Sequence, residues 1–509
     1  MDLSQLQFTR RSALASGAAL AAGAAIPPGL AHAAVPRDRI GRRERALLAR
    51  WAGDTWRSLA AMADPDTGLV SDNITGDLAA GGRAAYTSPT NLGGYLWSAL
   101  VARELGIISR REASARIARS LETLAGLEHH TPSGMYFNWY NPADGSVITT
   151  WPESGDPVTP FVSSVDAAWL GAGLLCVRNG DKANSDQAGE MFARMRFDVF
   201  ADPTFVKPHL NYGGFYVEQP AGSDVVLRDL IGADPVWYTA NHHYDTIVSE
   251  TRITTYLGIA KRQVPGSAYY QAWRTFPDVN YEWQEMPPEG TWRTYLGVDV
   301  FEGVYNYGGL QVVPGWGGSM FEELMPNVFV PEDSWAPRSW GRNHRRHVDA
   351  QIYHGLRDAR YGFWGFSPAS NPAGGYREYG VDALGLDPDG YFSDQENTNF
   401  VWDKPPTSYG NGVVTPHALF LGMMHRPQLA TANLTKLAGS FDAYGRGGFY
   451  DAVAVRSGTV ARRYLSLDQA MVMGALGNVI GDAVLQRYFC AGEVSRQVRP
   501  VIAPEKFGL

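Results

Sequence analysis

Carboxyl side chains stand near the start of several apolar stretches of this chain. They belong to Asp166, Glu250, Glu322, Glu323 and Asp468. Two carboxyl groups can act as general acid and general base, because one donates a proton while the other accepts one. Glu250 is our first candidate for the acid, and Asp468 and Asp166 are equal candidates for the base. The alternative role is structural, because acidic residues at a helix start cap free N–H groups and interact favourably with the helix dipole.

The segment 315–326, Gly-Trp-Gly-Gly-Ser-Met-Phe-Glu-Glu-Leu-Met-Pro, joins a glycine-rich loop to a short helical stretch. Glycines let the backbone approach a ligand closely, and Trp316 offers a flat apolar face. The apolar residues that follow have the spacing of a buried helical stripe. We expect this segment at the mouth of a binding site, with Glu322 accepting hydrogen bonds from sugar hydroxyls or joining a structural network.

Other candidate binding residues are aromatic or polar. The chain has 15 Trp, 25 Tyr and 21 Phe, and aromatic rings can stack on sugar rings, although most must fill the core. Besides Trp316 and Glu322, the predicted substrate-binding residues are Trp139, Trp364, Tyr376, His242, His243, Asn91 and His417. For each aromatic residue taken alone, core packing is an equal alternative.

Helical periodicity dominates the chain, and two kinds of helical stretch alternate. The stretches of one kind are apolar nearly all round: 91–101, 163–177, 249–260, 317–325, 413–424 and 466–480. The others are amphipathic: 43–62, 110–127, 186–197, 343–358 and 427–437, with 267–274 as a poorly defined sixth. Helices that are apolar on every side need protein around them. This alternation predicts an all-α (α/α)6 toroid, a double ring of helices in which the polar starts of the inner helices converge on one pocket.

A long region rich in Gly, Pro and Asp, residues 361–412, interrupts the helical pattern. A stretch of this length inside a compact domain is usually functional, and we expect loops or hairpins over the pocket mouth. An ordinary capping loop is the alternative. No low-complexity linker divides the rest of the chain, so residues 34–509 are predicted to form a single catalytic domain.

The first 33 residues have the pattern of an export signal. Arg10 and Arg11 precede an apolar run that is too short to span a bilayer, and Ala31-His32-Ala33 has the pattern of a cleavage site. The paired arginines indicate the twin-arginine route, with a periplasmic or extracellular destination. A retained membrane anchor is the alternative.

Composition argues against several function classes. The formal net charge is −8 and no basic tract is present, so a nucleic-acid partner is not expected. After signal removal no membrane partner is expected either. Cys176 and Cys490 are too few for a disulfide scaffold. Cys176 lies in an apolar run, and a buried free thiol is favoured over a bridge to Cys490.

No cofactor or metal site is predicted. The pairs His242-His243 and His344-x-x-His347 lack the companions that a zinc site requires. The acidic segments 387–390 and 394–396 could hold calcium but do not follow the helix–loop–helix calcium pattern. Phosphate-binding and dinucleotide-binding fingerprints are also missing from the sequence.

Several segments resemble the bacterial glycoamylase-like family, which includes secreted endo-β-1,2-glucanases and a domain of cyclic β-1,2-glucan synthases. Residues 163–175 are similar to its Ser-Thr-Ile-Asp-Thr-Ala helix, and 318–326 to its Gly-Thr-Met-Phe-Glu-Tyr-Leu-Met-Pro. Residues 413–419 resemble Val-Val-Ala-Pro-Tyr-Ala, 448–453 resemble Gly-Phe-Tyr-Glu-Ala, and Asp468-Gln469 matches an Asp-Gln pair. The N-terminal half resembles a domain of glycoamylase relatives. Ser249 and Glu323 depart from the family's Asn and Tyr.

The resemblance implies an (α/α)6 fold and hydrolysis of β-glucan with inversion, and the leading expectation is an exported endo-β-1,2-glucanase. It also implies that Asp166 and Asp468 match family aspartates, while members differ in which carboxylate is the base. Two alternatives stay open. One is an enzyme of the same fold with another reaction, either an exo-glycosidase or a polysaccharide lyase. The other is a non-catalytic glycan-binding protein.

Overall fold

The computed structural model describes residues 40–509 except 222–225, 240–242, 278–285 and 387–408. Residues Ile40–Leu509 form one compact unit. The predicted export signal and the acidic segments 387–390 and 394–396 lie outside the described residues. In the part of the chain that the structure describes, no helix combines the length and apolar character needed to cross a membrane.

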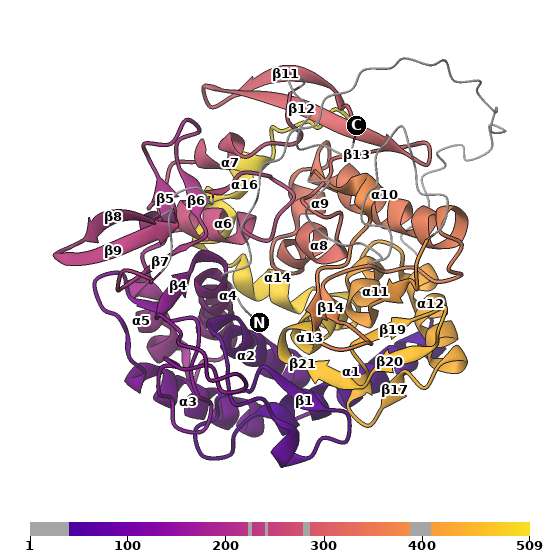
Figure 1. Ribbon diagram of the computed structural model, residues 1–509, viewed down its shortest axis with the longest axis horizontal. Helices are drawn as coiled ribbons and strands as arrows, with labels where there is room; N and C mark the ends of the chain where they lie inside the picture. Colours follow the sequence, from indigo (N-terminus) through magenta and orange to yellow (C-terminus); the bar gives the residue numbers. More distant parts are fainter. Residues whose placement is uncertain (1–39, 222–225, 240–242, 278–285, 387–408) are drawn as a thin grey trace. The chain divides into compact units, whose positions relative to one another are not determined.

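Six predominantly apolar helices among the described residues form the centre of this unit (Figure 1). They are α2 (Pro89–Glu104), α4 (Ser164–Gly180), α6 (Arg252–Ala260), α8 (Met320–Phe329), α11 (Pro416–Met423) and α13 (Ser466–Ile480). Helix α2 packs on α4, α4 on α6, α8 on α11, α11 on α13, and α13 on α2. Helix α6 meets α8 through Arg252, whose Nη1 donates to the Glu322 carbonyl oxygen at 2.7 Å. The six stretches predicted as buried helices are confirmed, and their contacts form a closed cycle.

Serines at the residue before three of these helices provide the caps. The Ser163 hydroxyl accepts from the Asp166 backbone N–H at 3.2 Å, and the Ser319 hydroxyl accepts from the Glu322 N–H at 3.2 Å. Ser88 caps α2 in the same way, with Pro89 as the first helical residue. Because the serines satisfy these N–H groups, the carboxyl groups of Asp166 and Glu322 are available for other contacts.

Glycines allow α2 and α4 to approach closely. A Cβ atom at Gly93 would lie 2.4 Å from the Trp169 carbonyl oxygen, and one at Gly173 would lie 2.7 Å from the Gly93 Cα. Only a residue without a side chain fits such spacing. This explains why the apolar stretches of the sequence are rich in small residues.

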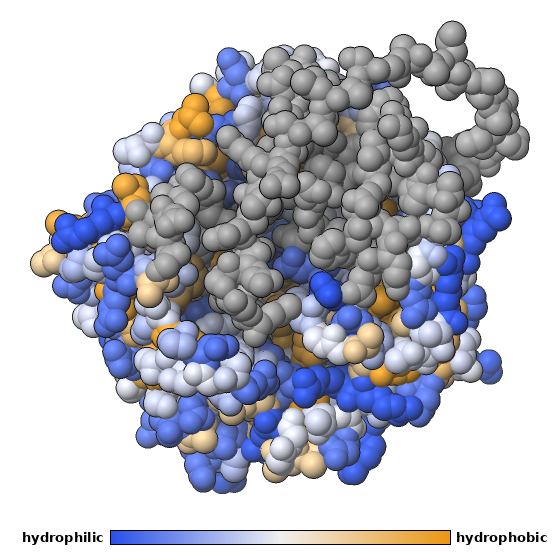
Figure 2. Space-filling view, in the orientation of Figure 1, coloured by the Kyte–Doolittle hydropathy of each residue, from blue (hydrophilic) through white to orange (hydrophobic). Residues whose placement is uncertain are grey.

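Amphipathic helices pack outside the central six. They are α1 (Arg42–Met62), α3 (Arg110–Gly126), α5 (Ser185–Arg194), α7 (Ala268–Gln271), α10 (Trp340–Tyr353) and α12 (Pro427–Ser440). A π-helical turn at His354–Asp358 continues α10. The expected partner at 267–274 is reduced to the four residues of α7. Hydrophilic residues predominate along the lower rim of the face shown in Figure 2, as outward faces of such helices require.

Short C-terminal helices complete the helical part: α14 (Val484–Phe489), α15 (Glu493–Gln497) and α16 (Arg499–Ile502), with α9 (Glu332–Trp335) earlier in the chain. Helix α14 packs against α2, α4, α8 and α13. The chain end is held by a buried ion pair in which the Arg274 Nε donates to Glu505 Oε1 at 2.8 Å. Cys176 and Cys490 are both free thiols, and Cys176 is buried, as expected.

Small antiparallel sheets connect the helices, so the all-α prediction is too narrow. The described sheet with four strands has the order β4 (Phe161–Ser163), β7 (Gly214–Tyr216), β9 (Asp234–Thr239) and β8 (Val226–Ile231). Those with three are β10 (His243–Tyr244), β6 (Leu210–Tyr212), β5 (Ala201–Asp202); β11 (Glu289–Tyr295), β12 (Val298–Tyr307), β13 (Leu310–Val312); and β16 (Val413–Val414), β19 (Ala452–Ala454), β20 (Thr459–Ala461). The paired strands are β1 (Asn73–Thr75) with β21 (Arg463–Leu465), β2 (His129–His130) with β3 (Met135–Tyr136), β14 (Ala369–Ser370) with β15 (Tyr376–Arg377), and β17 (Tyr444–Gly445) with β18 (Gly448–Phe449).

Two of these pairs bear on the pocket. The β14–β15 hairpin confirms the expectation of a hairpin within 361–412. The β1–β21 pair places Asp72 beside the start of α13, where the Ser466 N–H donates to the Asp72 carbonyl oxygen at 2.7 Å. The strands therefore bring residues from connecting segments to the starts of the central helices.

Candidate active site

Glu250 lies just before α6 and is held by groups from two neighbouring helices. The Trp169 indole Nε1 of α4 donates to Glu250 Oε2 at 2.6 Å. The Glu250 backbone N–H donates to Glu322 Oε2 of α8 at 2.7 Å. Burial and the nearby Glu322 charge raise the pKa of Glu250 well above its usual range, against the lowering effect of the Trp169 hydrogen bond. The raised pKa favours the protonated form of Glu250, which is the form that a general acid requires.

Glu322 holds the backbone that carries Glu250. Its own pKa is raised by burial to about 7, although the Glu250 N–H and the Ser249 hydroxyl favour its ionised form. The neighbouring Glu323 is buried among other partners, with its Oε1 at 2.6 Å from His344 Nδ1. The structure thus places Glu322 at the site and Glu323 in a separate network behind it.

Asp166 shares the surroundings of Glu250. Its Oδ1 accepts from the Thr90 hydroxyl at 2.5 Å, and the hydroxyls of Ser88 and Ser163 also favour its ionised form. Burial outweighs these donors and raises its pKa. The Asp166 charge acts on Glu250 and contributes to the raised pKa there. Asp166 and Trp169 are three residues apart on α4, so they lie on one face of the helix.

Asp72 is a further carboxyl group near Asp166, and it lies beside the start of α13. The Asn91 side-chain amide of α2 donates to Asp72 Oδ1 at 2.9 Å. Burial raises the pKa of Asp72, and the Asp166 charge raises it further. Asn91, predicted as a substrate-binding residue, therefore positions a carboxylate that sequence reasoning missed.

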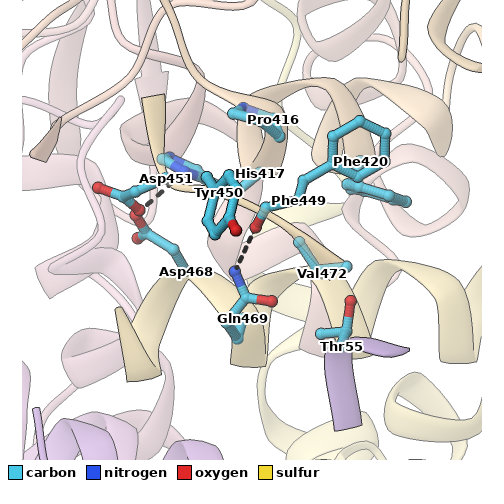
Figure 3. Close-up of a pocket in the computed structure, with 10 residues that line it drawn as sticks. All are labelled: Thr55, Pro416, His417, Phe420, Phe449, Tyr450, Asp451, Asp468, Gln469 and Val472. Atoms are coloured by element: carbon cyan, nitrogen blue, oxygen red, sulfur yellow. Dashed lines mark hydrogen bonds and ion pairs between the residues drawn. The ribbon is translucent and has the colours of Figure 1, made fainter. Parts of the chain in front are cut away.

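Asp468 belongs to a second group, shown in Figure 3. His417 Nδ1 is 3.2 Å from Asp468 Oδ2, and Asp451 faces both side chains. Burial raises the pKa of Asp468 to about 7 and, together with the Asp468 charge, raises that of Asp451 well above its usual range. Burial lowers the pKa of His417 to about 4. A small cavity of about 10 Å³ adjoins the group and is also lined by Thr55 and Gln469.

Tyr376 connects the two groups. Burial raises the pKa of Tyr376 well above its usual range. The charges of four carboxyl groups raise this pKa further: Asp468, Glu378, Asp451 and Glu250. Tyr376 therefore lies within electrostatic range of both carboxyl groups, on the β14–β15 hairpin. Tyr244 has the same relation to the first group, because burial and the charges of Glu250, Glu322 and Asp166 raise its pKa.

The predicted aromatic platforms differ in their placement. Trp139 is partly exposed and forms a cluster with Tyr86 and Trp151, at ring-centre distances of 5.6 and 5.3 Å. The Asn73 amide donates to the Tyr86 hydroxyl at 3.4 Å, so this cluster adjoins the Asp72 end of the site. Trp316 is partly buried beside Phe276, at 6.1 Å between ring centres.

Trp364 is not a platform. It is 2% exposed, and the backbone of α11 passes against its ring, since a Cβ at Gly422 would lie 3.2 Å from it. With both faces in the core, the ring has no surface for a sugar. The core-packing alternative was correct for this residue.

His243 also corrects a prediction. Its Nε2 is 3.0 Å from Asp202 Oδ2 and its ring stacks on Phe205 at 4.0 Å between ring centres. Because successive side chains of a strand point to opposite faces, the next residue, Tyr244, faces the site instead. His242 lies outside the described residues.

Four residues of the site were missed from the sequence: Asp72, Asp451, Tyr244 and Glu378. Asp451 lies within the segment 448–453 that carries the family resemblance, which was the available signal. Asp72 and Tyr244 stand in short connecting strands or next to them, where helical periodicity gives no information. Glu378 follows β15, and its only signal was its position in the long loop region.

Comparison with known proteins identifies families that the sequence resembles. The glycoamylase family model matches residues 242–492, and residues 50–196 match a second family described as a protein of unknown function. The cyclic β-(1,2)-glucan synthase NdvB of Rhizobium meliloti is 28% identical over 268 residues, which cover 49% of this chain. The chain spans 8% of the length of that relative.

Solved structures match over most of the chain. An endo-β-1,2-glucanase from Chitinophaga pinensis has 15% identity and a TM-score of 0.63, covering 90% of this chain and 98% of its own. One from Talaromyces funiculosus has 13% identity and a TM-score of 0.61, covering 92% and 94%. A β-1,2-glucanase from Parabacteroides distasonis has 16% identity and a TM-score of 0.64, covering 90% and 60%. These structures share the fold of this chain, and over residues 242–492 the chain is similar to the glycoamylase family, described as a putative glucoamylase.

Proposed function

We propose that this protein is an inverting endo-β-1,2-glucanase and that its central and outer helices form an (α/α)6 toroid. Structures with the same fold are described as endo-β-1,2-glucanases with sophorotriose and glucose or with sophorose bound. The observation that carries the proposal is the position of Glu250. Its carboxyl group is buried, fixed by the Trp169 indole, and surrounded by other carboxyl groups.

In the proposed reaction the Glu250 carboxylic acid donates its proton to the leaving glycosidic oxygen. Asp166 accepts a proton from a water molecule, and the water oxygen bonds to the anomeric carbon from the opposite face. We choose Asp166 over Asp468 because its charge acts directly on Glu250, whereas Asp468 faces Asp451 and His417. The Trp139 cluster, which adjoins the Asp72 end of the site, and Tyr376, which lies within electrostatic range of Glu250, supply aromatic surfaces.

The competing reactions find less support. A polysaccharide lyase needs basic groups facing a uronate, and the chain carries a run of basic residues at Arg345, Arg346 and His347. All three stand on the outer helix α10, where His347 is fully buried and Arg346 donates to the Gln311 carbonyl oxygen at 3.2 Å. A glycan-binding protein without catalysis would not require a buried acid whose pKa is raised.

The proposal also includes export of the chain by the twin-arginine route, with residues 1–33 as the signal and residues 34–509 as a single catalytic domain. It is supported by the paired arginines and the short apolar run of that segment. Expression with Arg10 and Arg11 replaced by lysine should leave the protein in the cytoplasm. Export that is unchanged would contradict this part of the proposal.

The central test is incubation with a panel of β-glucans, α-glucans and cell-wall glycans, with product sizes resolved over time. We expect β-1,2-glucan to be cut to intermediate oligosaccharides first, with the new reducing end formed as the α-anomer. Release of monosaccharide or disaccharide alone would indicate an exo mode. A β-anomer would indicate retention, and an ultraviolet-absorbing double bond would indicate a lyase.

Variants test the roles of the carboxyl groups. Glu250→Gln should lower kcat by about 10²–10⁴-fold, the usual contribution of a general acid, while oligosaccharide binding measured by calorimetry survives. Asp166→Asn should have an effect of similar size. Glu122→Gln, an exposed glutamate on α3, is the matched control and should keep full activity. Turnover that survives Glu250→Gln would refute the assignment of the acid.

A further inference from the structure

His417, Asp451 and Asp468 bring three potential metal ligands together. Each offers one ligand atom, and these atoms all lie within 4.8 Å of one another. His417 is the second residue of α11, Asp468 the third of α13, and Asp451 stands between β18 and β19. The three side chains are 2%, 5% and 2% exposed, and Figure 3 shows them turned toward one another.

Polar atoms of this group are buried without a hydrogen-bond partner in the described chain. They are both ring nitrogens of His417, Oδ1 of Asp451 and Oδ2 of Asp468. The second Asp451 oxygen, Oδ2, accepts from the Ser370 backbone N–H at 2.6 Å, which fixes the orientation of the carboxylate. Leaving buried polar atoms unpaired costs about 1–3 kcal/mol each. A proton or a bound ion that pairs with these atoms would remove this cost.

Two arrangements could do so. If Asp451 carries a proton, it can donate a hydrogen bond to Asp468, which satisfies the two carboxyl groups. His417 Nδ1 still lies 3.2 Å from Asp468 Oδ2 without a well-directed hydrogen bond, and Nε2 has no hydrogen-bond partner among the described residues. A cation would accept electron pairs from the imidazole and both carboxylates at once. The adjacent cavity has room for about one water molecule as a further ligand. The cation therefore satisfies more of the buried atoms than the proton does.

The ligand set indicates the class of cation. Imidazole nitrogen and carboxylate oxygen bind Zn²⁺ at about 2.0–2.2 Å, so two ligand atoms on one ion are at most roughly 4.4 Å apart. In a tetrahedral site the ligand atoms lie roughly 3.3–3.6 Å apart, so side chains at the observed limit of 4.8 Å must draw together by about an ångström when the ion binds. One nitrogen with two oxygens suits Zn²⁺ or Mn²⁺, whereas Ca²⁺ and Mg²⁺ prefer oxygen ligands alone.

We infer that His417, Asp451 and Asp468 form a binding site for a divalent transition-metal ion of the zinc class. The ion joins the starts of α11 and α13 to the segment between β18 and β19. The site goes beyond the proposed glucanase activity and does not depend on it. It also departs from the expectation, based on spacing alone, that the chain has no metal site.

The test is titration of the full-length protein with ZnCl₂ by calorimetry after dialysis against EDTA and then against chelator-free buffer. We expect one Zn²⁺ per chain and a higher Tm with Zn²⁺ than without, because a ligand that binds only the folded state stabilises it. MnCl₂ should also bind, and CaCl₂ should bind at least a hundredfold more weakly. Absence of stoichiometric Zn²⁺ binding to the wild-type protein would overturn the inference.

Variants locate the bound ion. Asp451→Asn and, independently, His417→Gln should each weaken Zn²⁺ binding at least a hundredfold. Asp442→Asn is the matched control, because its side chain is 72% exposed and pairs with Arg462 on the surface. Zinc binding that persists in both ligand variants would place the ion elsewhere and refute the site. If no Zn²⁺ binds and Asp451→Asn raises the Tm, the shared proton is the correct arrangement and the inference is wrong.

The Glu250→Gln variant separates this inference from the proposed function. It should bind Zn²⁺ as the wild-type protein does while losing hydrolysis. Loss of zinc binding in Glu250→Gln would place the ion at the wrong group of carboxylates. A wild-type protein that binds Zn²⁺ but cleaves no glucan would refute the proposed function and leave the metal site standing.

Discussion

Replacement of Trp169 by phenylalanine tests how the protein controls Glu250. The substitution removes the indole N–H that donates to Glu250 Oε2 at 2.6 Å. A hydrogen bond to a charged group contributes about 1.5–3 kcal/mol, and every 1.4 kcal/mol corresponds to about a tenfold change in an equilibrium constant. Because this bond favours the carboxylate form, its loss should shift the ionisation equilibrium of Glu250 roughly tenfold to a hundredfold toward the protonated acid.

The direction of the effect on activity follows from the role of Glu250. A general acid is active while protonated, so activity falls as pH rises through its pKa. Removal of the indole donor raises that pKa further, and the alkaline limb of kcat/KM should move to higher pH. We also expect a lower kcat at the optimum, because the carboxyl group loses the contact that fixes its orientation. The assay is hydrolysis of β-1,2-glucan oligosaccharides over a range of pH.

Trp97→Phe is a matched control. Trp97 is buried next to Trp169, at 6.3 Å between ring centres, but its indole donates to the Ala470 carbonyl oxygen at 3.0 Å. Both variants lose the same ring and should lower the Tm by comparable amounts, whereas Trp97→Phe should leave the alkaline limb in place. An alkaline limb that is unchanged in Trp169→Phe, or that moves to lower pH, would refute the reasoning.

Three further predictions concern stability. Gly93→Ala should lower stability by about 1–3 kcal/mol through overpacking of α2 on α4, whereas Gly53→Ala on α1, with open space around the added Cβ, should be neutral or stabilising in thermal unfolding. Glu332→Gln leaves the buried Arg252 guanidinium without its ion-pair partner, and we expect a loss of about 3–5 kcal/mol in denaturant unfolding. Against the effect of burial, Arg252 and His344 lower the pKa of Glu332 to about 2, and Glu323 raises that of His344 to about 9. The contribution of Glu332 is therefore lost as pH falls from about 4.5 toward 2, and that of His344 as pH rises from about 6.5 through 9. Stability that is flat across both ranges would contradict these charge assignments.

The buried network behind α8 illustrates one limit of sequence reasoning. Glu323 departs from the family's Tyr, and its partners Asn343 and His344 stand on α10, about 20 residues away. Arg252 of α6 then joins Glu332 at 2.8 Å. These pairs form only after four helices, α6, α8, α9 and α10, have packed together, so no spacing within the sequence predicted them. Glu323 is consequently a structural residue, not part of a binding subsite.

Local pattern predicted the helices well because a helix is determined mainly by residues three and four positions apart. The six apolar stretches and the longer amphipathic helices around them were readable in this way, whereas the hairpin within 361–412 was expected from the Gly-, Pro- and Asp-rich composition of that region. The short sheets were not, because strands of two or three residues carry too few alternations to distinguish them from loops. For the same reason Asp72 and Tyr244 were missed. His243 was predicted to face the site, whereas the next residue, Tyr244, does so.

The sequence by itself determined which helices are buried and which carboxyl groups stand at their starts, including Asp166, Glu250 and Asp468. Only the tertiary structure decided how those groups are divided: Glu250 with Trp169, Glu322 and Asp166 on one side, and Asp468 with His417 and Asp451 on the other. The physical reason is the range of the interactions. Periodicity reports contacts along one helix, whereas the pKa of a buried carboxyl group depends on desolvation and on charges that other segments bring within a few ångströms.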